Sequence, residues 1–383
     1  MKIGFIATEI GLQKGGAYMG GNVNNVITVS QALAERGHDI IIITTTPRDT
    51  APNPTANIDW ATVYEYSPRF DHGTPGYFAS FSAYATRTVA KLRQQNKLNV
   101  LTVHAGFPLW GLVGTAANIL TDCPVIHVQY CPVDQISGES IYDYLNHPWF
   151  IRRYLSGADE LVGISPIVSD SLRNLTNQDN IQTILPAINT DIYTPVPELG
   201  KAEVPTISYL GSLNEQKGLD LLVDAFVDIQ EEFDCQLRLG LEVRSKESGS
   251  ELAKRIEENP DIDVNGIVDD VPKFLAESHI FVAPFRTTMG PADYPLAALE
   301  AMSCGIPIVV TDVGGLKQLV MDSNGGVCIG EPSAKGISST VSDLLKNPNK
   351  RSTIGLRARE YILQHCSESS VADQLEELLE EKL

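Results

Sequence analysis

The sequence lacks the features that mark several common classes of protein. Its six cysteines stand singly, with no CxxC pair and no histidine at metal-ligand spacing, so neither a disulfide framework nor a zinc site is expected. No apolar run approaches the roughly 18 residues of a membrane helix. Basic residues are scarce, because 29 Lys and Arg stand against 48 Asp and Glu, for a formal net charge of −19. Nucleic acid is therefore not an expected partner, since phosphate binding needs a basic surface.

The composition and the first residues predict a folded, cytoplasmic protein. Apolar residues make up 43% of the 383 positions and charged residues 20%, which excludes a mainly disordered chain. The chain runs directly into a strand pattern without the layout of a signal peptide, and the unpaired cysteines suit a reducing compartment. At roughly 150 residues per domain, the length predicts about two to three domains.

Short β-branched runs alternate with amphipathic helical stretches along the chain, which is typical of a parallel sheet covered by helices on both faces. The pattern restarts at Thr206, so we expect two doubly wound domains with a cleft between them. Four prolines between 186 and 205 mark a linker. The expected strands are 3–7, 40–43, 100–104, 125–129, 160–164, 206–210, 236–241, 280–283 and 308–311, and the expected helices include 23–36, 219–233 and an acidic helix at 371–383.

Charge supports the same division of the chain. Residues 1–188 have a net charge of −3 and residues 189–383 a net charge of −16, so the two bodies have different surfaces. We expect a first domain at 1–188, a linker at 189–205, a second domain at 206–360 and a C-terminal helical segment at 361–383.

Segments spread over nearly the whole chain resemble, in the same order, the GT-B glycosyltransferases of the retaining family-four, or group 1, type. Each segment is short, but the ordered set is specific. A Rossmann dehydrogenase is not supported, because the sequence has no G-x-G-x-x-G after its first strand and no acid at the end of the second. The matching segments are Gly20-Gly21, 34–40, 163–165, 185–191, 209–218, 295–307 and 311–315.

The resemblance implies a GT-B architecture, with two Rossmann-like domains facing each other across a cleft and a C-terminal helix crossing back. It implies an enzyme that transfers a hexosyl unit from a nucleoside-diphosphate sugar to a hydroxyl acceptor, with retention of anomeric configuration. The acceptor is a saccharide, a lipid-linked molecule or a small molecule. No metal ion and no cofactor besides the donor are implied. A degenerate nucleotide-sugar-binding protein and a nucleotide-sugar epimerase of similar fold are the alternatives.

A donor diphosphate needs preplaced positive charge where its bond to the sugar breaks. Lys217 matches the family's diphosphate-binding lysine; the alternative is an exposed lysine at a helix start, which the helix dipole disfavours. The arginine that the family has directly after the glycine of the preceding strand is Ser212 here. Arg286 is the candidate that replaces its charge.

The segment that follows residue 293 is expected to bind the rest of the donor. Pro295 suits the first position of a helix whose free N–H groups, at Leu296 and Ala297, form an anion site next to Tyr294. A plain buried helix is the alternative. Glu300, in an apolar context, matches the family's ribose-binding glutamate; the alternative is a structural salt bridge.

The family's first motif glutamate is replaced by Ala292, so the contact to the donor sugar must be rebuilt. Asp293 is the candidate, and the alternative is a role as a helix N-cap.

In the first domain, Gly20 and Gly21 can bring backbone close to phosphate or sugar, or form a tight turn. His104 ends a strand at a position where the family often has histidine. Tyr130 stands where the family's sugar-contacting histidine is expected. A structural role is the alternative for the histidine. With Lys217 and Asp293, these two side chains complete the expected catalytic set.

One further absence is local. The segment 72–121 contains no acid, although about six acids would be expected in a stretch of this length. We expect the segment 77–97 to guide an anionic acceptor or to make weak peripheral contact with the inner face of an anionic membrane. The alternative is an aromatic stripe packed in the core, with a solvated basic edge. The basic residues are Arg87, Lys91, Arg93 and Lys97, and the stripe consists of Tyr77, Phe78, Phe81 and Tyr84.

Overall fold

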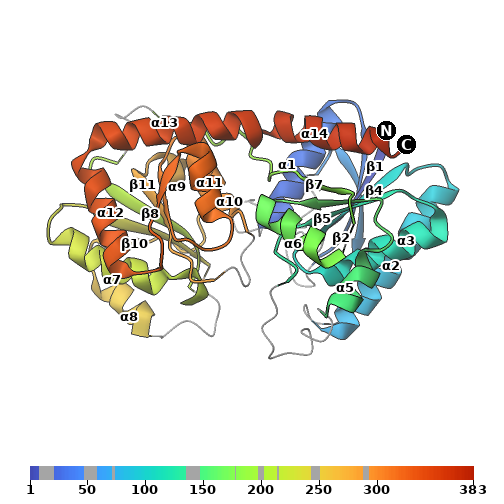
Figure 1. Ribbon diagram of the computed structural model, residues 1–383, viewed down its shortest axis with the longest axis horizontal. Coiled ribbons are helices and arrows are strands. Elements are labelled where there is room, and N and C mark those ends of the chain that lie inside the picture. The colour runs from blue at the N-terminus through green and yellow to red at the C-terminus, as the bar shows by residue number, and fades with distance from the viewer. Residues whose placement is uncertain are drawn as a thin grey trace. The chain divides into compact units, whose positions relative to one another are not determined.

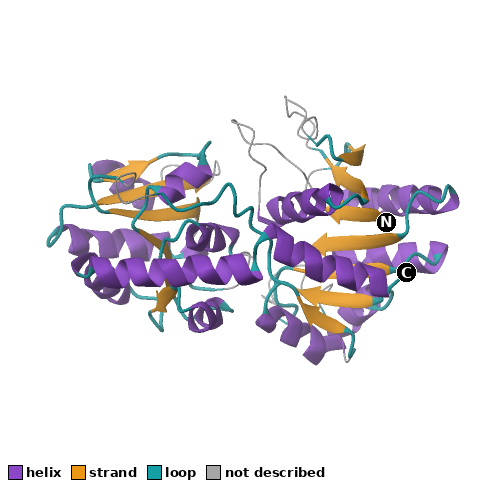
Figure 2. Ribbon diagram, turned by 90° about the horizontal axis from the view of Figure 1, so that it is seen from above, coloured by secondary structure: helices purple, strands orange, loops and turns teal. Residues whose placement is uncertain are grey.

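The structure, a computed structural model, describes residues 1–7, 21–46, 58–70, 74–134, 147–176, 178–196, 202–213, 215–242, 251–287 and 293–383. The chain divides into two compact units (Figure 1). The first contains Met1–Ala187 and Glu368–Leu383, and the second contains Ile188–Ser367. In each unit the strands lie between layers of helices (Figure 2).

Parallel strands form the sheet of the first unit. Within the described residues their spatial order is β3 (Ala61–Tyr66), β2 (Asp39–Thr45), β1 (Lys2–Ala7), β4 (Val100–Ala105), β5 (Val125–Gln129), β6 (Glu160–Gly163) and β7 (Ile181–Thr183). The helices are α1 (Gly21–Glu35), α2 (Pro75–Gln94), η1 (Pro108–Trp110), α3 (Gly111–Thr121), α5 (Pro148–Leu155), α6 (Pro166–Thr176) and α14 (Glu368–Glu381).

The helices of the first unit cover both faces of its sheet. The connections from β1 to β2 and from β4 to β5 move in opposite directions, so right-handed crossovers place α1 and α3 on opposite faces. Helices α2, α3, α5 and α6 pack in a row on one side, and α1 packs against α14 on the other (Figure 1).

The second unit repeats this construction. Its described strands are parallel, in the order β10 (Ile262–Val264), β9 (Gln236–Glu242), β8 (Thr206–Ser212), β11 (Ile280–Ala283), β12 (Ile308–Val310) and β13 (Gly326–Cys328). The helices are η3 (Glu215–Lys217), α7 (Leu219–Gln230), α8 (Glu251–Glu258), α9 (Val271–Ala276), α10 (Leu296–Ser303), α11 (Leu316–Ser323), α12 (Ala334–Lys346) and α13 (Pro348–His365).

Two doubly wound parallel sheets confirm the predicted fold class. The nine expected strands are all present, because continuous β-branched runs mark strands that are buried on both faces. The strands β3, β7, β10 and β13 were not expected from the sequence. These strands lie at or next to the sheet edges, and their half-exposed residues lack such a run.

The chain enters the second unit at Ile188 and leaves it after Ser367. These two ends of the second unit are adjacent, because the Ile188 N–H donates a hydrogen bond to the Cys366 carbonyl at 2.7 Å. The helical segment expected at 361–383 consists of the end of α13, in the second unit, and of α14, in the first. None of the helices in the described ranges has the length and apolarity that a membrane span requires.

Ionic contacts hold α14 to the rest of the first unit. Arg36, which follows α1, pairs with Glu376 and Asp373, both at 2.7 Å. His38 contacts the second oxygen of Glu376 at 2.6 Å. The hydrogen bonds from Arg36 and His38 hold the pKa of Glu376 below its ordinary value. The carboxylate therefore stabilises the folded unit at neutral pH, and this contribution is lost as pH falls through the lowered pKa.

Glu376→Gln is expected to loosen α14. At neutral pH, exchange of the α14 amide hydrogens should reflect a loss of roughly 1 kcal/mol or less, because the contacts are partly exposed to solvent. The difference from the unmodified protein should vanish in acid, where Glu376 is protonated. Glu377→Gln, a neighbouring exposed position, is the control. Equal effects of the two substitutions would contradict the assignment.

Candidate active site

The direction of the connections reverses between two adjacent strands in each sheet. In the second unit this happens between β8 and β11, and in the first between β1 and β4. Loops at the carboxyl ends of such strands diverge, which leaves room for a ligand. The candidate residues of the second unit lie at the end of β8 or follow β8 and β11, and His104 lies at the end of β4.

The loop that carries Lys217 lies against the loop after β11. Arg286 N–H donates to the Gln216 carbonyl at 2.9 Å. Gly218 then has a φ of 67°, and a Cβ at this position would collide with the Pro284 carbonyl. Only glycine permits this backbone conformation together with so close an approach. Lys217 is consequently held, half-buried, beside the point where the connections reverse.

Arg286 forms an ion pair with Asp220, a partner that was not expected from the sequence. Its guanidinium pairs with one oxygen of Asp220, in the first turn of α7. The other oxygen is buried and has no hydrogen-bond partner among the described residues. An acid in the first turn of α7 was the signal available in the sequence. Ser212, the last residue of β8, is buried, and its carbonyl accepts a hydrogen bond from the Tyr209 hydroxyl at 3.0 Å.

Helix α10 starts one residue later than expected, because Pro295 is its N-cap, with φ −65° and ψ 126°. The first bonds to the Pro295 carbonyl come from Ala298 and Leu299. The N–H groups of Leu296 and Ala297 precede these bonds, so they are the donors that a helix N-terminus leaves for an anion. A one-residue shift of this kind leaves the predicted donors at the helix start.

Glu300 is buried on α10, with 5% of its surface exposed, and is hydrogen-bonded to the Tyr193 hydroxyl. Burial raises the pKa of Glu300 to about 7, and the bond from Tyr193 acts in the opposite direction. The partner is a phenol rather than the cation of the salt bridge considered from the sequence. Ser303 and Arg359 both donate to the Tyr193 carbonyl, at 2.7 and 2.6 Å, and anchor its backbone.

Asp293 lies at the start of a different helix from the one expected. Its carboxylate accepts a hydrogen bond from Gly315 N–H at 3.0 Å, directly before α11, and it is 4% exposed. A Cβ on Gly315 would lie 2.5 Å from a carboxylate oxygen of Asp293 and 2.6 Å from the Tyr294 ring, so a larger residue would displace these side chains. The capping alternative is thus realised at α11 and not at α10, which has no side-chain cap. The Tyr294 ring is interior, which leaves its backbone for ligand contact.

The first unit contains a buried chain of hydrogen bonds with a defined direction. Asn25 on α1 accepts from Ala187 N–H at 2.7 Å, so its amide nitrogen is the group that donates to the Tyr130 hydroxyl at 2.6 Å. Tyr130 is fully buried, and its own proton then goes to Nδ1 of His104, 3.0 Å away. This order leaves the ring proton of His104 on Nε2. Asn25 was not singled out from the sequence, because its partners are distant along the chain.

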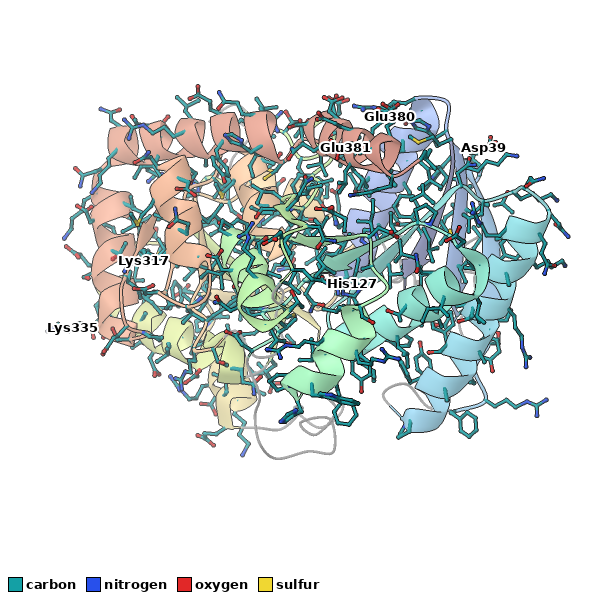
Figure 3. All side chains as sticks on the ribbon, turned by 45° about the vertical axis from the view of Figure 1, so that its right-hand side comes forward. Asp39, His127, Lys317, Lys335, Glu380 and Glu381 are labelled. Atoms are coloured by element: carbon teal, nitrogen blue, oxygen red, sulfur yellow. The ribbon has the colours of Figure 1, made fainter. Side chains whose placement is uncertain are left out.

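His104 is therefore a neutral hydrogen-bond donor at the end of β4. Burial, and secondly the nearby His127, lower its pKa to about 3. Its Nε2 has no partner among the described residues. His127 lies in the interior of the first unit, as expected, and contacts the Gln129 side chain at 3.1 Å (Figure 3). The structure thus places an unused donor where the connections of the first sheet reverse.

Two predicted positions, Gly20 and Ala292, lie outside the described residues. Gly21 is the first residue of α1, and the neighbouring Asn22 amide lies beside Gly106, which follows β4. Within the described chain, Tyr130 and His104 come together in the first unit, and the Lys217 loop meets Arg286 in the second.

Known proteins share this fold across the whole chain. The structure of an Anabaena protein, Alr3699/HepE, in complex with UDP matches with a TM-score of 0.77 at 17% identity, covering all of both chains. A sucrose-phosphate synthase from Thermosynechococcus elongatus matches with a TM-score of 0.78 at 19% identity, covering 99% of this chain and 98% of that one. Both similarities concern the fold.

Proteins related in sequence share a low identity with this chain, but some of them align over most of its length. An N-acetyl-alpha-D-glucosaminyl L-malate synthase of Bacillus anthracis is 25% identical over 362 residues, 91% of this chain and 90% of that protein. A D-inositol 3-phosphate glycosyltransferase of Xylanimonas cellulosilytica is 23% identical, over 91% and 88%. An uncharacterized glycosyltransferase of Methanocaldococcus jannaschii is 24% identical over 56% of this chain and 57% of its own length.

Two family models match the two halves of the chain. The model described as Glycosyltransferase Family 4 matches residues 19–192, and the model described as Glycosyl transferases group 1 matches residues 204–347. Within the described residues, the matched ranges contain every strand of the second sheet and every strand of the first sheet except β1. The chain therefore belongs to the family-four, group 1 glycosyltransferases, and it is an enzyme with the GT-B fold.

Proposed function

We propose that this glycosyltransferase moves a hexosyl unit from a nucleoside-diphosphate sugar to a hydroxyl acceptor, with retention of anomeric configuration. The observation that carries the proposal is the carboxyl edge of the second sheet, where the Lys217 loop meets the loop after β11 and the α10 start precedes a buried Glu300. Similar structures were solved with UDP and with UDP-glucose, which supports a donor of this class. Relatives are named for D-inositol 3-phosphate and L-malate, both of which carry hydroxyl groups.

The negative charges of the donor's diphosphate suit Lys217 and the free N–H groups at the start of α10. Lys217 and the first N–H groups of α10 stabilise the diphosphate as it leaves, because preplaced donors are most effective where negative charge develops. Glu300 accepts hydrogen bonds from the ribose hydroxyls. In the reaction, the bond from the anomeric carbon to the diphosphate oxygen breaks and a bond to the acceptor oxygen forms. The acceptor oxygen itself attacks the anomeric carbon, so no side chain has to act as nucleophile, and its proton passes to the departing phosphate oxygen, so no side chain has to act as base.

Residues of the first unit orient the sugar or the acceptor. His104 donates from Nε2 to a hydroxyl oxygen, and Asn25 and Tyr130 act as positioning residues that hold its proton on that nitrogen. The departures from the family pattern at Ser212, Tyr130 and Ala292 favour a second hypothesis, a protein that binds nucleotide sugar without transferring it. A panel of UDP, GDP and ADP sugars distinguishes the two, because either protein is stabilised by its ligand and only the enzyme turns it over.

Lys217→Ala should reduce turnover by about 100-fold or more, the usual scale for the loss of one charge-stabilising donor. The measurement is the initial rate with the nucleotide sugar that the panel identifies. Lys335→Ala, at an exposed lysine of the same unit, should leave the rate unchanged (Figure 3). Normal turnover in a folded Lys217→Ala protein would remove this lysine from the site.

Nucleotide affinity should increase as pH rises through about 7, because burial holds the pKa of Glu300 near that value and its ionised form is the stronger acceptor. In calorimetric titrations, Glu300→Gln should weaken the binding of free nucleoside diphosphate and make its affinity less dependent on pH. Tyr193→Phe should move the midpoint to higher pH, since it removes the hydrogen bond that lowers the pKa. Unchanged nucleotide affinity in Glu300→Gln, with altered sugar selectivity, would contradict the ribose assignment.

Two substitutions separate the roles of Asp293. Asp293→Asn retains an oxygen that accepts from Gly315 N–H but loses the charge. It should therefore weaken the binding of the nucleotide sugar and leave the affinity for free nucleotide and the stability of the protein nearly unchanged. Asp293→Ala should in addition destabilise the protein by roughly 0.5–2 kcal/mol through loss of the α11 cap. If Asp293→Asn binds the nucleotide sugar as the unmodified protein does, the residue is structural.

A further inference from the structure

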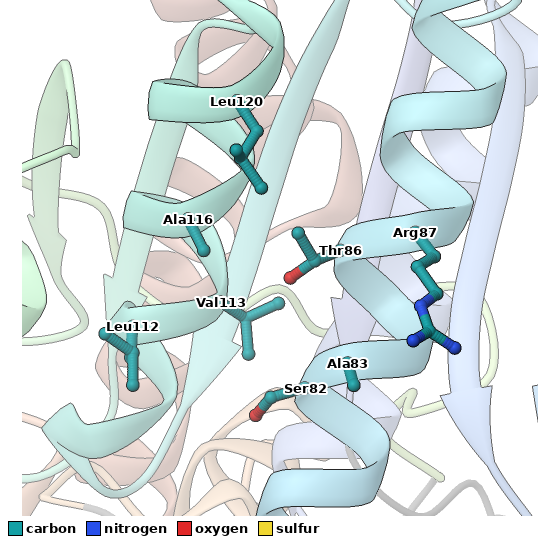
Figure 4. A pocket seen from close by; sticks show the side chains of 8 residues that line it. All are labelled: Ser82, Ala83, Thr86, Arg87, Leu112, Val113, Ala116 and Leu120. Carbon is teal, nitrogen blue, oxygen red and sulfur yellow. The ribbon is translucent and has the colours of Figure 1, made fainter.

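An open apolar groove of about 340 Å³ lies between α2 and α3 on the surface of the first unit (Figure 4). Its volume is at the lower end of the roughly 300–1,000 Å³ of small-molecule sites. Leu120, at the end of α3, is 68% exposed, and its neighbour Ile119 is 70% exposed. The residues that line the groove are Leu112, Val113, Ala116 and Leu120 from α3, and Ser82, Ala83, Thr86 and Arg87 from α2.

The charged residue that lines this groove is basic, and the acid next to α3 in the sequence, Asp122, follows the helix. Arg87 lines the groove, and Lys91 follows one turn later on α2; both are exposed. Within the described residues, neither forms an ion pair. Between 72 and 121 the sequence has no acid, in a chain that carries 48. A protein with a net charge of −19 thus presents a basic, apolar surface at α2 and α3, where anions are attracted and not repelled.

The aromatic stripe of α2 is not part of this surface. Tyr77 and Phe81 are buried, and Phe81 packs in the core with residues of the sheet and α3. The half-buried Phe78 and Tyr84 contact the rings of Trp110 and Tyr66, so the stripe as a whole follows the packing alternative considered from the sequence. The exposed apolar side chains come instead from α3 and from α5, which packs against α3. On α5, Trp149 is 63% exposed and Arg153 is exposed.

We propose that α2 and α3, together with α5, dock the first unit on an anionic lipid bilayer. Leu120 and Ile119 enter the boundary between headgroups and acyl chains, Arg87 and Lys91 pair with lipid phosphates, and the groove receives part of an acyl chain. Apolar side chains flanked by basic ones are the composition of a surface that lies in the membrane interface. The attachment is reversible and sensitive to salt, because only a few charges contribute. This property is separate from the glycosyl transfer proposed above.

The test is co-sedimentation of the full-length protein with vesicles of phosphatidylcholine alone or of equal parts phosphatidylcholine and phosphatidylglycerol. The protein should sediment with the anionic vesicles, and less at high salt. Arg87→Glu/Lys91→Glu and Leu120→Glu should each lower the partition coefficient about tenfold or more. The matched controls are Lys254→Glu/Lys335→Glu and Leu356→Glu, at exposed positions of the second unit, where Leu356 is 69% exposed.

Circular dichroism and thermal unfolding establish that each variant is folded. Retention of binding by the controls, with loss in the α2–α3 variants, supports the proposal. No sedimentation with anionic vesicles overturns it, and so does an equal loss in the controls. Binding to phosphatidylcholine alone that is unaffected by Arg87→Glu/Lys91→Glu also overturns it. Because turnover of a water-soluble acceptor should be unchanged in these variants, failure here is distinguishable from failure of the proposed function.

Discussion

Right-handed crossovers between parallel strands are the constraint on which both candidate sites depend. Because the connections leave β8 and β11 in opposite directions, the loops that follow these strands cannot cover their carboxyl ends. The same reversal between β1 and β4 brings His104 to an equivalent position in the first unit. Lys217, Arg286 and His104 are far apart in sequence, yet each follows or ends a strand beside such a reversal. Topology therefore selects these positions before any side-chain chemistry is considered.

Burial then determines how the selected side chains behave. Removal from water disfavours charge, so the pKa of Glu300 rises towards neutrality while that of His104 falls to about 3. The carboxyl group is thus poised to change its charge near physiological pH, whereas the imidazole stays neutral and donates. Their protein partners, Tyr193 and Tyr130, are both phenols, which hydrogen-bond to these groups without adding a charge.

The central strands could be predicted from the sequence, because burial on both faces imposes continuous apolar runs. The edge strands β3 and β13 could not, since a half-exposed strand carries no such pattern. For the site, the resemblance indicated Lys217 and Glu300, but the sequence contains no sign that Asp293 caps α11. An acid in the first turn of α7 is visible in the sequence, but it does not identify Arg286 as the partner of Asp220. These partners are separated by 22 and 66 residues, and only folding brings them together.

The sequence by itself determined the two doubly wound domains, the family resemblance and the absence of acids over 72–121. These are properties of residue order and composition, which local periodicity and motif spacing express directly. Only the tertiary structure decided that Phe81 on α2 is buried and that Leu120 on α3 is the exposed apolar residue. It also decided the direction of the hydrogen bonds from Asn25 to His104. Burial and hydrogen-bond direction depend on contacts between residues that are distant in the sequence. An amphipathic pattern shows that one face of a helix is buried, but it does not specify which residues that face will contact.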